Sequence, residues 1–292
     1  MLTIGVVNNM PPAAIRSTER QFEEILTAAA GDDMPVRIHW YRLVGARPEH
    51  YAGLDDLWGR DLDGLIVTGA EPKGASLSEG QFWTSFTKTV DWATRHTSSA
   101  IWSCLAAHAA VLHLDGIERR PSPEKIFGLF DSVKSSDHAI LANTEPAWRV
   151  PHSRWNDLSE QELIARGYTV VARSEAAGVD TFVKQCDQSM FVFMQSHPEY
   201  DAHSLLREYH RDVARFHGGL QDRFPEAPRN YFDDGTVAEL LATRDSPAGQ
   251  ERGQELLAEV RVENSWRRIT IQMYRNWLCY LMRHSHALAQ DA

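Results

Sequence analysis

Short apolar runs alternate with amphipathic segments along the chain, and this alternation limits the fold more than any other feature of the sequence. Strand-like runs occur at residues 2–7, 36–43, 62–69, 99–103, 168–173, 180–184 and 190–194. Helical spacing of apolar residues occurs from about residue 17, and over 82–95, 105–114, 202–216 and 266–284. Strands that alternate with helices are typical of an α/β domain. The sequence therefore predicts an open, mostly parallel sheet flanked by helices.

Two stretches depart from this alternation. Residues 118–158 are richer in Pro, Ser and His and are expected to form loops with a short hairpin. Residues 233–262 are charged and short of large apolar side chains, which indicates an exposed insertion with one helix. No internal repeat divides the chain, so residues 1–292 are expected to form a single domain.

Charge and cysteine content narrow the classes of function. Thirty Lys and Arg against forty Asp and Glu give a formal net charge of −10, which argues against a general nucleic-acid binder. One local basic site would still suffice for a phosphorylated ligand. No run approaches the roughly 20 apolar residues of a membrane span, and the N-terminus lacks signal-peptide features. Cys104, Cys186 and Cys279 form no CxxC motif, which favours reduced thiols, a cytoplasmic location and no metal site.

Cys104 lies where the 99–103 strand meets the 105–114 helix. A strand that turns sharply into a helix presents one side chain above the sheet, as in a nucleophile elbow. The helix N-terminus favours the thiolate, and the Leu105 amide would be placed to bind an oxyanion. The alternative is a buried, inert cysteine that packs as a small apolar residue.

A second candidate, His197, follows the 190–194 strand directly and begins a His-Pro-Glu sequence. Active sites of open α/β sheets gather at such strand ends. His197 could deprotonate Cys104 while Glu199 orients the imidazole. The alternative is a His-Pro turn with a capping acid. A cysteine elbow together with strand–His-Pro-Glu is more specific than either part.

These paired elements resemble the class I glutamine-amidotransferase-like (flavodoxin-like) folds, whose triad is Cys…His-x-Glu. Within that superfamily the chain resembles the homoserine O-acyltransferases, the O-succinyltransferases of methionine biosynthesis. Nearly the whole chain takes part, with resembling stretches at 7–11, 63–70, 104–110, 124–128, 150–155, 197–202, 230–232 and 265–267. Pro-His-Ser-Arg and His-Pro-Glu-Tyr-Asp are the most specific of these.

The resemblance implies roles for individual residues. Cys104 matches the family's acyl-accepting nucleophile, His197 the base and Glu199 its partner. Substrate-binding positions fall on Lys125, Ser153 (at the acyl pocket) and Arg211, which would hold the amino-acid carboxylate. A guanidinium suits a carboxylate. Without the resemblance, the i, i+4 spacing of Arg207, Arg211 and Arg215 would favour a different interpretation, in which Arg211 lies on a solvent-exposed face of a helix.

Departures from the family pattern affect the acyl group. Lys73 and Ser153 fall on acyl-specificity positions. At the position of Lys73, family members that transfer succinyl groups have glycine, and members that transfer acetyl groups have glutamate. A lysine there could pair with a succinyl carboxylate, or could turn to solvent. His108 replaces the family's usual glutamine. Trp102 and Ala106 stand where glutamine amidotransferases carry glycines, which lowers the expectation of that activity.

The implied reaction is ping-pong transfer of an acyl group from acyl-CoA to the hydroxyl of L-homoserine through a Cys104 thioester. Succinyl-CoA is favoured as donor over acetyl-CoA, both as co-substrates, and no bound cofactor is expected. The partners expected are the two substrates and, by resemblance, a second copy in a homodimer, without nucleic acid or membrane. Alternatives are acetyl transfer, an acceptor such as serine, a glutamine amidotransferase or γ-glutamyl hydrolase, and a non-catalytic binding protein.

Overall fold

A nine-stranded mixed sheet forms the centre of the protein in a computed structural model, which describes residues 1–70, 76–242, 252–253, 255–256 and 258–288. The strand order is β2-β1-β3-β4-β9-β8-β7-β5-β6. The first five of these strands pair in parallel, and every later pair is antiparallel. An α/β sheet flanked by helices was predicted and is confirmed, and its antiparallel half comprises four of the eight pairings.

The parallel half contains β1 (Leu2–Val7), β2 (Val36–Tyr41), β3 (Gly64–Val67), β4 (Ser99–Ser103) and β9 (Ser189–Met194). The antiparallel half contains β5 (Arg120–Lys134), β6 (Ala147–Asp157), β7 (Thr169–Ser174) and β8 (Gly178–Cys186). The helices are α1 (Ile15–Ala30), α2 (Leu54–Trp58), α3 (Trp83–His96), α4 (Leu105–Asp115), α5 (Glu160–Ala165), α6 (Ser204–His217), α7 (Asp234–Ala242) and α9 (Arg267–Leu288). Two 3-10 turns, η1 (Pro12–Ala14) and η2 (Ala139–Leu141), are also present.

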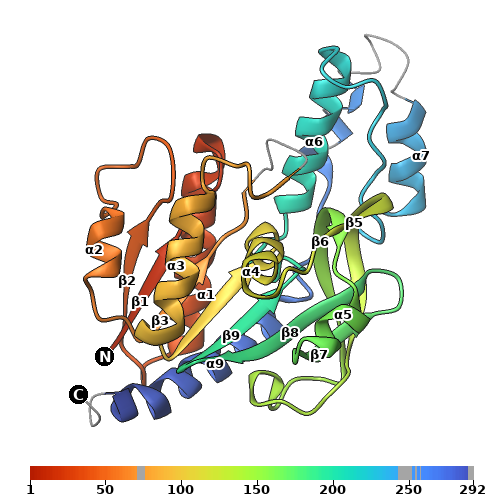
Figure 1. Cartoon of the computed structure of the whole chain (residues 1–292). Helices are drawn as coiled ribbons and strands as arrows, with labels where there is room; N and C mark the ends of the chain where they lie inside the picture. Colours follow the sequence, from red (N-terminus) through yellow and green to blue (C-terminus); the bar gives the residue numbers. More distant parts are fainter. Residues whose placement is uncertain (71–75, 243–251, 254, 257, 289–292) are drawn as a thin grey trace.

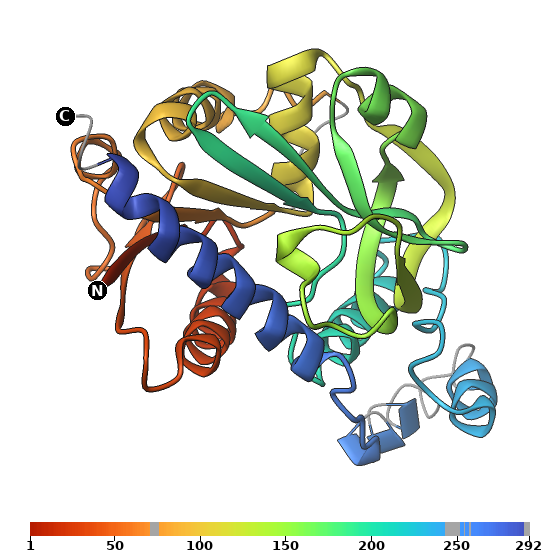
Figure 2. The ribbon, with the colours of Figure 1, turned by 90° about the horizontal axis from the view of Figure 1, so that it is seen from below.

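Helices cover both faces of the sheet (Figure 1). On one face, α1 and α9 pack together, and α9 runs across the sheet when it is seen from below (Figure 2). On the other face lie α3 and α4. The strands supply both cores by alternation: in β9, Val192 belongs to the first core, whereas Phe191 and Phe193 belong to the second. This alternation is the period-2 pattern that a buried strand requires.

The expectation of loops and a short hairpin at residues 118–158 was wrong. The segment instead contains β5 and β6, which form a long antiparallel hairpin with a register shift between Pro121 and Ile126. Prolines at the start of β5 obscured the strand. In β6, the buried positions include His152 and Arg154 beside apolar Trp148 and Val150, so the apolar alternation is incomplete.

A third, smaller core lies where the antiparallel half meets α6 and α7. It contains Phe127 and Leu129 of β5, Leu205 and Tyr209 of α6, and Trp266. Of the insertion expected at 233–262, α7 lies within the described residues, and its Leu240 is buried in this core. The third core fixes α6 beside the sheet edge where the predicted site residues gather.

Candidate active site

Cys104 sits in a strained turn between β4 and α4. Its φ of +51° and ψ of −113° are unusual for a residue with a side chain, and such strain costs about 1–3 kcal/mol. Backbone hydrogen bonds hold it: the Cys104 N–H donates to the Met194 carbonyl at 2.7 Å, and the Cys104 carbonyl accepts from Ala107 at 3.0 Å. The turn leaves the thiol partly exposed at the carboxyl end of the parallel strands, as a nucleophile elbow requires.

The Leu105 amide, expected as an oxyanion donor, begins α4 immediately after the thiol. The first amides of a helix have no partner within it. Gly69 lies against this point: a Cβ on Gly69 would stand 3.2 Å from the Leu105 nitrogen and 3.4 Å from the Cys104 Cβ. Any larger residue at position 69 would therefore crowd the approach to the oxyanion site. Gly69 was not predicted as a site residue, although it ends the 62–69 run.

His197 and Glu199 form the second part of the site. The two atoms His197 Nδ1 and Glu199 Oε1 are 2.8 Å apart, and both residues are buried. The backbone N–H of His197 donates to the Pro151 carbonyl of β6 at 2.8 Å, and this bond joins the loop after β9 to the β5–β6 hairpin. With Nδ1–H directed at Glu199, the neutral imidazole keeps Nε2 as its base.

Charge determines the protonation of His197. Burial by itself lowers the pKa of this imidazole, but the Coulomb attraction of Cys104 and Glu199, together with the hydrogen bonds that the ring makes to both, raises the pKa well above its usual value. The site therefore favours an imidazolium beside Cys104. That group can protonate a leaving thiolate and later serve as the base.

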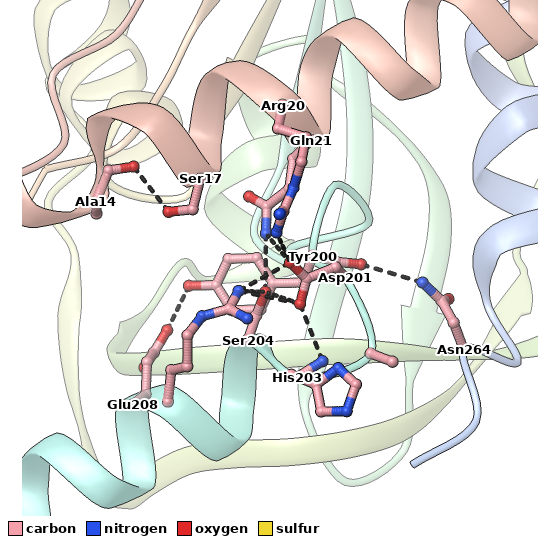
Figure 3. A network of polar contacts seen from close by, with 12 residues as sticks. Ala14, Ser17, Arg20, Gln21, Tyr200, Asp201, His203, Ser204, Glu208 and Asn264 are labelled. Carbon is pink, nitrogen blue, oxygen red and sulfur yellow. Dashed lines mark hydrogen bonds and ion pairs between the residues drawn. The ribbon is translucent and has the colours of Figure 1, made fainter. Parts of the chain in front are cut away.

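Tyr200 covers one face of the imidazole. The two rings are nearly parallel, with centroids 4.3 Å apart. The Tyr200 hydroxyl donates to Glu208 Oε1 at 2.5 Å, and the Ser153 hydroxyl donates to Glu208 Oε2 at 2.5 Å. Figure 3 shows the bond between Tyr200 and Glu208. The predicted acyl-pocket residue is thus linked to the loop that bears His197 through a carboxylate that was not predicted.

Lys125 and Arg211, both predicted to bind substrate, converge on Asp212 of α6. The Lys125 Nζ lies 3.1 Å from Asp212 Oδ2, and the Arg211 Nε lies 2.9 Å from Asp212 Oδ1. Arg215 lies near the same oxygen, at 3.7 Å. Asp212 was not predicted, and no local motif marks it. Lys73 lies outside the described residues.

A cavity of about 530 Å³ lies between α1 and α6, next to the loop that bears His197 and Glu199. Its lining includes Gly69, His197 and Glu199. One wall is largely apolar, and the α6 wall is charged. The residues that line it are Met10, Pro11, Ala13, Ala14, Ser17, Thr18, Gln21, Phe22, Thr68, Gly69, His197, Glu199, Tyr200, Ser204, Arg207, Glu208, Arg211 and Arg215.

A polar network beside the cavity joins α1 to the N-terminal end of α6 (Figure 3). The Gln21 side chain of α1 donates to the Ser204 hydroxyl at 2.8 Å. Asp201 accepts from Arg20 at 3.2 Å and from Arg207 at 2.9 Å. These bonds fix the N-terminal end of α6 against α1, so the cavity has two defined walls.

Behind the elbow, buried polar groups tie α4 to the strands. His108 Nε2 lies 2.7 Å from Gln195 Oε1, and the Gln195 amide donates to Asp157 at 3.0 Å. Asp157 in turn pairs with buried Arg154 at 3.1 Å. Burial lowers the pKa of His108 to about 3 and outweighs its hydrogen bond to Gln195. His108 is therefore a neutral donor one turn after Cys104.

Other features of the described residues concern metal, membrane and remaining thiols. Within that part of the chain, no three His, Cys, Asp or Glu side chains are grouped as a metal site would need. No helix there has the length and apolar character of a membrane span. Burial raises the pKa of the Cys186 thiol to about 11, which keeps this thiol protonated. Cys186 is buried, whereas Cys104 is partly exposed at the elbow.

The fold and the Cys–His–Glu arrangement define a class of protein. A glutamine amidotransferase from Thermotoga maritima superimposes with a TM-score of 0.51 at 15% identity, covering 94% of this chain and 98% of that one. The glutaminase domain of a Trypanosoma brucei CTPS, with bound acivicin, gives a TM-score of 0.51 at 12% identity over 69% of this chain and 88% of its own. The protein therefore has the class I glutamine-amidotransferase-like fold, as predicted.

Sequence comparison identifies the family within this class. The model of the homoserine O-succinyltransferase family matches residues 1–288. A homoserine O-succinyltransferase of Rhodopseudomonas palustris is 44% identical over 96% of this chain and 88% of its own length. One from Bradyrhizobium japonicum is 42% identical over 96% of this chain and 90% of its own. The chain belongs to the homoserine O-succinyltransferase family, a family of acyltransferases, which confirms the predicted resemblance.

Proposed function

We propose that this protein transfers a succinyl group from succinyl-CoA to the hydroxyl of L-homoserine, an early step of methionine biosynthesis. The observation that best supports this activity is the Cys104 elbow beside the buried His197–Glu199 pair. It occurs in a chain that the family model matches almost from end to end. The succinyl group is favoured over acetyl by the names of the relatives. The proposed contribution of Lys73 to that choice stays a prediction.

In the first half-reaction, the Cys104 thiolate attacks the carbonyl carbon of the CoA thioester. The new C–S bond gives a tetrahedral oxyanion, which the Leu105 amide stabilises. The raised pKa of His197 supports its role as the acid here. The bond from carbon to the CoA sulfur then breaks, CoA takes the His197 proton as it leaves, and a succinyl-Cys104 thioester remains.

In the second half-reaction, neutral His197 removes the proton of the homoserine hydroxyl through Nε2. The hydroxyl oxygen attacks the Cys104 thioester, the C–O bond forms and the C–S bond breaks. The products are O-succinyl-L-homoserine and the Cys104 thiolate beside an imidazolium. Glu199 stabilises that imidazolium and fixes the tautomer, a role that the 2.8 Å contact supports.

Arg211 is proposed to bind the α-carboxylate of homoserine, with Lys125 beside it. Both cations stand around Asp212, and Arg211 lines the cavity that contains His197. Exchange of Asp212 for a substrate carboxylate keeps each cation paired. Ser153 is proposed to contact the acyl group. A cytoplasmic location and a homodimer complete the proposal, the second by family resemblance.

The test is mass spectrometry of the protein after incubation with succinyl-CoA in the absence of acceptor. Wild-type protein is expected to gain one succinyl group that maps to Cys104, and addition of L-homoserine is expected to remove it. Cys104→Ala should form no adduct and no product. Cys186→Ala is the matched control and should retain both. An adduct on Cys186 or Cys279, or product formation without Cys104, contradicts the proposal.

A further inference from the structure

Three arginines form a row along the cavity. Arg207, Arg211 and Arg215 lie on α6 at intervals of one turn, and all three line the cavity wall. Because a helix rises 1.5 Å per residue, the row spans roughly 12 Å. The three side chains are between 38% and 47% exposed, so their guanidinium groups stand at the cavity surface rather than in the core. This row is longer than a single carboxylate needs.

Acids of α6 and its N-terminal loop hold these guanidinium groups. Arg207 pairs with Asp201 at 2.9 Å. Asp212 pairs with Arg211 at 2.9 Å and stands 3.7 Å from Arg215. Ion pairs at such exposure contribute little to stability, because solvent screens the two charges. A polyanionic ligand can therefore bind the same guanidinium groups without the loss of a strong ion pair. Asp201 and Asp212 meanwhile keep these groups in position.

The net charge of the chain makes a local cationic site necessary for a phosphorylated ligand. A protein of net charge −10 repels polyanions at long range. On the cavity lining, the α6 arginines are accompanied by two acids, Glu199 and Glu208. Glu199 contacts His197, and Glu208 accepts from Tyr200 and Ser153. The arginine row is thus the part of the lining that can receive phosphate.

The direction of the row matches the shape of a CoA thioester. The reacting sulfur must lie at the Cys104 end, where the cavity contains Gly69 and His197. Arg215 lies in the last turn of α6, roughly 16 Å along the helix from Ser204. The facing wall is apolar at Met10 and Pro11, which suits the pantetheine arm between the two ends.

We propose that Arg215, with Arg211 beside it, binds the phosphates of the nucleotide end of the CoA thioester. This inference rests on the proposed function, because it names a subsite for the donor of that reaction. In a ping-pong cycle CoA leaves before the amino acid binds. Arg211 therefore serves a phosphate in the first half-reaction and a carboxylate in the second, whereas Arg215 serves the donor alone.

Steady-state kinetics with two donors tests the subsite. Succinyl-CoA carries the phosphates, and succinylpantetheine has the same reacting thioester without them. Arg215→Ala is expected to raise the KM for succinyl-CoA about tenfold, the scale of one charge-assisted contact, and to leave the KM for succinylpantetheine unchanged. Arg215→Lys should recover part of the loss, because the charge remains but the planar fork does not.

Arg149→Ala is the matched control, because Arg149 is 52% exposed and pairs with Asp131 on the β5–β6 hairpin. It should leave both KM values unchanged. An equal rise for both donors in Arg215→Ala, or no rise for either, overturns the subsite. Wild-type enzyme that uses succinylpantetheine as well as succinyl-CoA also overturns it while leaving the proposed function intact. Absence of turnover with both donors instead overturns the proposed function.

Discussion

The Tyr200 ring lies nearly parallel to the His197 imidazole, with an angle of 18° between the two planes and 4.3 Å between their centroids. An aromatic face stabilises a neighbouring cation, so this contact favours the imidazolium form of His197. The Tyr200 hydroxyl is in turn fixed by Glu208 at 2.5 Å. The imidazole is thus held at its edge by Glu199 and on its face by Tyr200, which we expect to act as a positioning residue.

Two substitutions at Tyr200 separate these contacts. Tyr200→Phe keeps the ring but removes the bond to Glu208, and we expect it to lower the free energy of unfolding by about 1–2 kcal/mol with a small loss of kcat. Tyr200→Leu also removes the ring and is expected to lower kcat on the order of tenfold. Chemical denaturation and steady-state rates measure the two effects. Equal kcat values in the two variants would show that the ring contact has no part in catalysis.

The Glu199 carboxylate is expected to set the upper pH limit of the proposed first half-reaction. Glu199→Gln removes one of the two charges that raise the pKa of His197, so the imidazolium loses its proton at lower pH. We expect the basic limb of kcat/KM for succinyl-CoA to move to lower pH and kcat to fall on the order of a hundredfold. Ser103→Ala, which removes only a 3.5 Å contact to Glu199, is the control. A basic limb that stays in place would argue against the pairing.

The α/β architecture and the reactive loops could be predicted because each depends on local pattern. Cys104 and His197 both follow buried strands, and the ends of parallel strands meet at one sheet edge. Glu208 and Asp212 could not be found in this way. Their importance comes from Ser153, Tyr200 and Lys125, which reach them from other parts of the chain.

The β5–β6 hairpin shows a second limit of local pattern. Its buried positions are filled partly by polar residues, which are satisfied by contacts made after folding. Arg154, for example, donates to the Asn156 carbonyl at 2.7 Å and pairs with Asp157. A pattern of apolar residues is interrupted in a strand whose inward face is partly polar, so it cannot indicate the full length of that strand.

Arg211 is expected to determine the affinity for the amino-acid acceptor. Arg211→Ala should raise the KM for L-homoserine by about 30- to 150-fold, because a charge-assisted carboxylate contact contributes about 2–3 kcal/mol. Arg211→Lys should lie between wild type and the alanine variant, since lysine keeps the charge without the bidentate geometry. Initial rates at saturating donor measure this. A rise confined to the KM for succinyl-CoA would show that Arg211 binds the donor alone.

His108 is expected to make the folded protein sensitive to acid. Its pKa is about 3 in the folded protein because of burial, whereas in the unfolded chain it returns to about 6.5. Between these values the unfolded state binds one more proton, so stability falls as pH falls, by about 1.4 kcal/mol per pH unit from this group. His108→Gln, which keeps a donor for Gln195, should lose that part of the slope. Urea unfolding at pH 7, 6 and 5 measures it, with exposed His210→Gln as control. Equal slopes in wild type and His108→Gln would show that His108 takes up its proton in the folded state.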